Sequence, residues 1–168
     1  MKTKEILILE PYFGGSHRSW ITGLQRHVKG NFTLLTLPPR KWKLRMQMAA
    51  HNFIEQIKSL PKRKRFYDGV LCSSLLDVSV FRSRLHEIDG WNPQAALITY
   101  FHENQFCYPL QVPDKSLYQF MAINFHSACA SDAIAFNSSF NKSSFLKGCQ
   151  RFIKEIKDMD LNYLVDEI

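Results

Sequence analysis

The residues best suited to chemistry follow an apolar run near the middle of the chain. Residues 95–98 are typical of a buried strand, and His102, Glu103, Asn104 and Gln105 come shortly after them. Side chains at the carboxyl ends of parallel strands point into the crevice where open α/β sheets bind ligands. Burying an imidazole, a carboxylate and two amides without partners costs free energy. We therefore interpret these residues as part of a ligand cleft, and the alternative is a loop network that satisfies itself.

A glycine turn precedes the first expected helix and forms the second candidate, Gly14-Gly15-Ser16-His17. Two glycines let backbone N–H groups approach a ligand closely, and a helix N-terminus favours negative charge, so the segment predicts a phosphate loop. Ser16 also fits the N-cap position. The segment is neither a Gly-x-Gly-x-x-Gly fingerprint nor a P-loop. A tight turn with a cap is therefore the alternative.

A cluster of four cations and an indole surrounds the expected start of the second helix. Its members are Arg40, Lys41, Trp42, Lys43 and Arg45. Each cation near a helix N-terminus opposes the macrodipole at a cost of about 0.3–1 kcal/mol, so a bound anion explains the cluster better. Trp42 would then stack on a base or pack beneath the loop. The denser run at residues 62–65 is interpreted as a solvated linker.

Polar residues recur after the fifth expected strand, where Asn137 and Ser138 precede another helix. Capping would explain one of them. Both together permit a second wall for the cleft that contains His102. Asp77 has a similar place after the third expected strand and fits a helix cap equally well.

Strands and helices alternate along the chain, and this order positions the candidate residues. Strands are expected at residues 6–9, 32–37, 70–72, 95–100 and 133–136. Helices are expected at residues 20–28, 46–57, 75–85, 117–129 and 139–146, with a polar helical pattern beyond Gly148. Such alternation predicts an α/β fold, a Rossmann-like and mainly parallel sheet with helices on both faces.

Composition limits the broad class of protein. Hydrophobic residues make up 45% of the 168 residues, enough for the core of one domain. No run of about 18 apolar residues occurs, so no membrane span is expected. The run at residues 6–9 lacks a small-residue cleavage site and is interpreted as a strand, not a signal peptide. The net charge of +7 favours a polyanionic partner such as nucleic acid or a phosphorylated ligand, with simple solubility as the alternative.

The cysteines give no sign of a metal centre. They are scattered at Cys72, Cys107, Cys129 and Cys149, and no Cys-x-x-Cys pair occurs. We therefore expect no zinc site and no bound metal. Sparse cysteines without a pattern are typical of a reducing cytoplasm, which is the expected location.

Four segments stand in an order and at a spacing that carry a family resemblance. They are residues 13–17, 37–42, 100–105 with Tyr108-Pro109, and 136–141. Together they resemble the N-terminal region of the tRNA-queuosine α-mannosyltransferases, which are retaining glycosyltransferases with the two-domain GT-B fold. The specific element is the string His-Glu-Asn-Gln-x-x-Tyr-Pro. The resemblance extends over nearly the whole chain.

The resemblance implies an activity and a division of roles. Enzymes of this family transfer mannose from GDP-mannose to queuosine in tRNA, with no cofactor besides the nucleotide sugar. Residues 1–157 would form the acceptor-side half, and residues 158–168 would begin a linker to a C-terminal Rossmann-like domain, in cis or in trans. His102 would contact the transferred sugar, and Glu103 would orient His102 or contact the acceptor.

The remaining candidates divide between donor and acceptor. Residues 14–17 would hold the donor phosphates, and the cationic cluster would contact RNA. Asn104, Gln105, Asn137 and Ser138 would form the cleft walls. Two alternatives stay open: a glycosyltransferase of the same fold that acts on a lipid or glycan, and a non-catalytic RNA-binding module.

Overall fold

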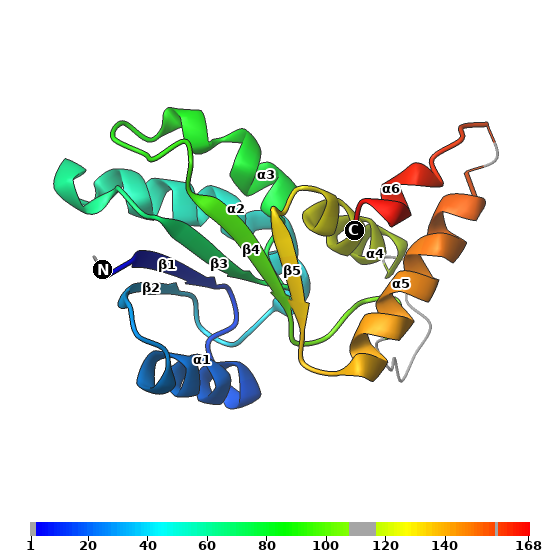
Figure 1. Ribbon diagram of the computed structural model, residues 1–168, viewed down its shortest axis with the longest axis horizontal. Helices are drawn as coiled ribbons and strands as arrows, with labels where there is room; N and C mark the ends of the chain where they lie inside the picture. Colours follow the sequence, from blue (N-terminus) through cyan, green and yellow to red (C-terminus); the bar gives the residue numbers. More distant parts are fainter. Residues whose placement is uncertain (1–2, 108–116, 157) are drawn as a thin grey trace.

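The computed structural model describes residues 3–107, 117–156 and 158–168. Within these residues, five parallel strands form one sheet in the order β2-β1-β3-β4-β5 (Figure 1). The strands are β1 (Glu5–Glu10), β2 (Asn31–Thr36), β3 (Gly69–Ser73), β4 (Ala96–Phe101) and β5 (Ala133–Phe136). Since all of them run in the same direction, their carboxyl ends lie along one edge of the sheet.

Helices cover both faces of this sheet. In Figure 1, α1 lies on one face, and α2, α3 and α4 lie on the other, with α5 beyond β5. The helices are α1 (Gly15–His27), α2 (Trp42–Ser59), α3 (Val78–Ser83), α4 (Leu117–Cys129), α5 (Ser139–Lys154) and α6 (Tyr163–Asp166). Short 3₁₀ turns η1 (Lys62–Lys64) and η2 (Leu85–Glu87) precede β3 and β4. None of the helices in the described residues is long and apolar enough to cross a bilayer.

The core explains why the central strands are continuously apolar. Leu7, Ile8 and Leu9 of β1 are all buried, because helices cover the sheet on both faces. One cluster fills the space between the sheet and α2–α3, and a second, rich in phenylalanine, joins β4 and β5 to α4 and α5. Leu161 and Leu164 pack against the second cluster. The predicted boundary between a domain and a linker at residue 158 stays a prediction.

The predicted Rossmann-like α/β fold is confirmed, and the elements differ from expectation mainly at their ends. Residues 75–85 were expected to be helical throughout, but α3 begins at Val78 because the Asp77 carboxylate accepts a hydrogen bond from the Val80 amide. Conversely, α5 runs to Lys154, past the predicted end at residue 146. Tyr108 and Pro109 of the family string lie outside the described residues.

Candidate functional site

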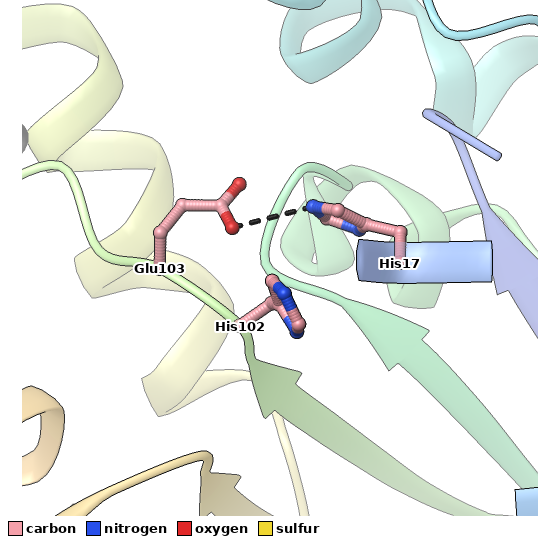
Figure 2. Close-up of side chains that lie close together, drawn as sticks. All are labelled: His17, His102 and Glu103. Carbon is pink, nitrogen blue, oxygen red and sulfur yellow. Dashed lines mark ion pairs between the residues drawn. The ribbon is translucent and has the colours of Figure 1, made fainter. Parts of the chain in front are cut away.

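A histidine held between two glutamates lies at the carboxyl edge of the sheet. Glu10 ends β1, His17 lies in the first turn of α1, and Glu103 follows β4. The Nδ1 atom of His17 lies 3.0 Å from Oε2 of Glu10. Its Nε2 atom lies 3.3 Å from Oε2 of Glu103 (Figure 2). The end of β1 and the start of α1 thus meet a segment that is distant in the sequence, the loop after β4, at one imidazole.

The turn before α1 brings His17 to this place. Gly14 is the N-cap residue, and Gly15 has φ of +51°, a backbone conformation that favours glycine. A Cβ atom on Gly14 would lie 2.7 Å from the Pro39 side chain, so the turn also lies close to the loop after β2. The expectation that Ser16 caps the helix is wrong. Ser16 is an exposed residue inside the first turn, and α1 has no side-chain cap.

Stacked aromatic rings hold α1 against the sheet near the site. The indole of Trp20 stacks on the Tyr100 ring of β4, with 3.8 Å between the centroids and 6° between the planes. His17 lies one turn before Trp20, and His102 follows Tyr100 by two residues. The stack therefore fixes the spacing of the two histidines.

Glu10 is a member of the site that the sequence analysis did not identify. Its side chain is 1% exposed. Oε1 accepts hydrogen bonds from the Tyr12 amide at 2.7 Å and the Ser73 hydroxyl at 3.2 Å, while Oε2 is bonded to His17. Both carboxylate oxygens are satisfied, as a buried charge requires. Its position at the end of a buried strand was the available signal.

His17 carries a positive charge at neutral pH. Burial alone would lower its pKa, but the hydrogen bonds to Glu10 and Glu103, with their negative charges, more than offset burial and raise the pKa to about 10. The imidazolium then donates through both ring nitrogens. This charge lies beside the glycine turn and the N-terminus of α1, between two carboxylates that take up both of its N–H groups.

His102 is the neutral partner of this pair. Its ring centroid lies 4.5 Å from that of His17, at 41°. Burial and the neighbouring His17 charge lower the pKa of His102 below its ordinary value of 6.5. Its Nδ1 atom is buried and has no hydrogen-bond partner. A neutral imidazole has one donor and one acceptor nitrogen, and His102 lines the smaller cavity described below.

Three residues of the site have the chemistry of metal ligands. His17, His102 and Glu103 offer ligand atoms that lie within 4.8 Å of one another. Histidine binds metals through a neutral ring nitrogen. A metal ion bound to His17 would therefore have to displace one of the two ring protons, each of which is hydrogen-bonded to a glutamate. The cluster as arranged favours a protonated His17 over a bound metal ion.

A cavity of about 480 Å³ opens beside this cluster. Its lining joins three predicted groups: the glycine turn with Ser16 and His17, the indole of Trp42, and the side chains of Glu103 and Gln105. The Oε1 atom of Gln105 is buried without a hydrogen-bond partner. The structure therefore brings the predicted phosphate loop and part of the His102 segment to one cavity.

The other predicted wall residues surround a smaller cavity of about 240 Å³, next to His102 and Glu103. The Asn137 amide donates to the His102 carbonyl at 2.7 Å, and Ser138 caps α5 by accepting from the Asn141 amide. Asn104 is 1% exposed, and its side chain donates to Oδ1 of Asn141 at 2.6 Å. Asn104 therefore lines the smaller cavity and also stabilises its wall through the hydrogen bond to Asn141.

The cationic cluster lies at the same edge as the site. Arg40, Lys41 and Lys43 are exposed, whereas Arg45 is half-buried. Trp42 packs against Phe120 of α4 with 5.1 Å between the ring centroids, and it also lines the larger cavity. The position of Trp42 is thus compatible with stacking on a base and with packing beneath the loop. The 62–65 run precedes β3 at the opposite edge.

The chain is similar to known proteins over nearly its whole length. A family model described as "tRNA-queuosine alpha-mannosyltransferase N-terminal" matches residues 5–168. A curated relative from Drosophila melanogaster, named tRNA-queuosine alpha-mannosyltransferase, is 32% identical over 167 residues. The match covers 97% of this chain but 41% of the relative, so the chain spans well under half of that protein's length. No solved structure matches the chain. By the extent of the family match, this chain belongs to the tRNA-queuosine α-mannosyltransferase N-terminal family.

Proposed function

We propose that this chain is the acceptor-side domain of a retaining GT-B glycosyltransferase that transfers mannose from GDP-mannose to queuosine in tRNA. The observation that carries the proposal is the cavity at the carboxyl edge of the sheet. There an uncapped helix N-terminus and an imidazolium line the cavity, and a neutral histidine lines the smaller cavity next to it, in a chain that belongs to this family. The cytoplasm is the expected place of action.

The donor diphosphate would lie at the glycine turn. Backbone amides at the N-terminus of α1 offer donors to a developing negative charge on the leaving group, while both N–H groups of His17 are already bonded to Glu10 and Glu103. Gly15 leaves room for a phosphate to approach the backbone, because a Cβ atom there would meet nothing within 4 Å, whereas the Cβ position of Gly14 is filled by Pro39. This arrangement stabilises the leaving group with the chain's own groups.

The transferred sugar would meet His102 and Glu103. His102 lines the smaller cavity, where its ring would bond a sugar hydroxyl. Retaining transfer builds oxocarbenium-like charge at the anomeric carbon. A neutral His102 adds no opposing charge there, which is the role that its lowered pKa supports. Glu103, already bonded to His17, would face the acceptor and not act as a nucleophile.

The acceptor would approach along the same edge. Arg40, Lys41 and Lys43 are exposed at the start of α2, beside the turn that contains Gly14. They fit phosphate contacts with RNA, since such contacts position a nucleic acid without reading its sequence. A C-terminal Rossmann-like domain, in cis or in trans, would close the cleft and supply the remaining donor contacts.

Mannose transfer to tRNA is the test. We expect the 168-residue chain alone to show negligible transfer, and the enzyme with its C-terminal half to transfer labelled mannose from GDP-mannose to queuosine-containing tRNA. Matched tRNA that lacks queuosine is the control and should stay unlabelled. Robust turnover by the chain alone would contradict the two-domain proposal. Transfer to lipid or glycan, or tRNA binding without any transfer, would identify one of the alternatives instead.

A further inference from the structure

The outer face of α5 carries a row of cations that the sequence analysis did not single out. Lys147, Arg151 and Lys154 are exposed and recur at helical spacing, so they share one face. They line a groove of about 490 Å³ together with Phe140. Within the described residues, none of the three cations makes an ion pair. In the α5 groove, defined by these four residues, three cations therefore have no ion-pair partner among the described residues, and one exposed carboxylate, Glu155, lies beside Arg151.

The α5 groove is continuous with the candidate site. Phe140 and Cys107 line both this groove and the smaller cavity that holds His102 and Glu103. Phe140 is 74% exposed, more than the other large hydrophobic residues that the structure describes. An open aromatic ring at the junction of a cationic groove and a polar cavity is a stacking platform for a base.

We propose that the α5 groove binds a strand of the acceptor RNA where it enters the site. Lys147, Arg151 and Lys154 would contact successive phosphates, and Phe140 would stack on a base beside the one to be modified. The proposal rests on the proposed function, because it assigns a surface to the RNA acceptor. It adds a binding surface on the opposite side of the site from the cluster at residues 40–45.

The spacing of the charges fits a nucleic-acid strand. A rise of 1.5 Å per residue places Lys154 about 10 Å from Lys147 along the axis of α5. One strand of a duplex carries a phosphate about every 3.4 Å of its axis, so three phosphates fall within this length. The hydroxyls of Ser143 and Ser144 and the amide of Gln150 also line the groove and are groups that bond phosphate oxygens. A membrane surface would need a broader apolar strip than one phenylalanine.

The two cationic surfaces lie on either side of the site. α2 begins after β2, and α5 begins after β5, at the two ends of the strand order. Four strand spacings separate those ends, which is about 19 Å. His17 and His102, which follow β1 and β4, lie between them. A folded RNA loop that reaches the site could therefore contact both surfaces at once.

The experiment measures tRNA affinity at several salt concentrations with the two-domain enzyme. The test variant is Lys147→Gln/Arg151→Gln/Lys154→Gln. The control is Lys29→Gln/Arg63→Gln/Lys64→Gln, which removes three exposed charges before β2 and β3, at the opposite edge of the sheet. The test variant should lower the slope of log affinity against log salt by about two to three, since each contact contributes about 0.7–0.9. The control should leave the slope within about half a unit of wild type.

A second variant separates stacking from charge. Phe140→Ala should weaken tRNA binding by about fivefold to a hundredfold without changing the salt slope, because a lost stack releases no counterions. Because Phe140 is exposed, the melting temperature of Phe140→Ala should match that of wild type. These results together support the proposal.

The outcomes that overturn it are distinct. If wild type transfers mannose to tRNA but the triple variant keeps its affinity and slope, the α5 groove does not bind RNA, whatever else covers it. If wild type neither binds nor modifies queuosine-containing tRNA, the proposed function fails, and this proposal fails with it. If the triple variant and the control lose tRNA affinity equally, the loss is a long-range effect of charge. That result also contradicts RNA binding in the α5 groove.

Discussion

The Nδ1 atom of His17 donates a hydrogen bond to Oε2 of the buried Glu10 carboxylate at 3.0 Å. This bond joins the first turn of α1 to the end of β1, and the Nε2 atom extends the link to Glu103 after β4. A proton on His17 therefore contributes both to the stability of the sheet edge and to the charge of the cavity.

The raised pKa of His17 predicts how stability changes with pH. Its pKa is about 10 in the folded chain and ordinarily 6.5, so the folded state retains a proton that the unfolded state releases. The stabilisation is complete below about pH 6.5 and is lost as pH rises through about 10. In between, the wild-type free energy of unfolding should fall relative to His17→Gln by up to about 1.4 kcal/mol per pH unit. Urea unfolding of both chains from pH 6 to 10 measures this difference.

A second histidine of the same helix provides the control for that titration. His27 is exposed in the last turn of α1. His27→Gln should therefore keep the pH dependence of wild type. A constant difference in stability between wild type and His17→Gln across this range would show that His17 does not hold the extra proton.

His102→Ala should damage turnover far more than folding. Removing a preorganised polar contact raises the barrier by about 2.7–4 kcal/mol, which corresponds to about 10²–10³ in kcat. Folding should change little, because the Nδ1 atom of His102 has no partner to lose. Mannose transfer and melting temperature of the two-domain enzyme are compared with His86→Ala, which removes an exposed histidine elsewhere. Intact turnover with a lowered melting temperature would make His102 a structural residue.

The lowered pKa of His102 adds a pH profile to the same experiment. Since its pKa lies below 6.5, the neutral ring persists into mildly acidic solution. The acidic decline of kcat/KM that depends on His102 should therefore lie below pH 6.5. A decline centred above pH 6.5 in wild type would assign the activity to another group.

The sequence predicted the sheet well, because its signals were local. Apolar runs of three to six residues, each ended by glycine, proline or polar residues, identified all five strands of the described chain. Polar residues directly after a strand were correctly placed at one edge, since parallel strands share a direction. That rule alone predicted that Gly14, His17 and Glu103 lie at the same edge of the sheet.

The pairing within the site could not be predicted, because it depends on long-range packing. Glu10 ends an apolar strand and gave no sign that it would be buried against His17. The cations of α5 are separated by three or four residues, so no dense run marked them, whereas the dense run at residues 62–65 lies at the opposite edge. Asn141 looked like part of a capping segment, and only the fold shows what its side chain joins.

Asn141 should prove essential to the wall beside His102. Its side chain donates to the Phe101 carbonyl at 2.8 Å and to Oδ1 of Asn137 at 2.9 Å, and it accepts from Asn104. Asn141→Ala leaves buried groups without partners, each costing about 1–3 kcal/mol. We expect the free energy of unfolding to fall by about 2–4 kcal/mol in urea titrations. The exposed neighbour variant Lys142→Ala should stay within about 0.5 kcal/mol of wild type. A small loss at Asn141 would mean that water replaces its bonds.

Two helical glycines should respond in opposite ways to alanine. A Cβ atom at Gly148 of α5 would overlap the Phe106 side chain, whereas one at Gly23 of α1 would meet nothing within 4 Å. Phe106 belongs to the loop after β4 and packs against Phe145 and Phe152 of α5, so it has little room to move. Gly148→Ala should therefore lower the free energy of unfolding by about 1–3 kcal/mol through overpacking. Gly23→Ala should raise it by about 0.5–1 kcal/mol, because alanine is the better helix former. Thermal and urea unfolding of the two variants measure both effects, and a stabilised Gly148→Ala would show that α5 does not approach Phe106 as closely as described.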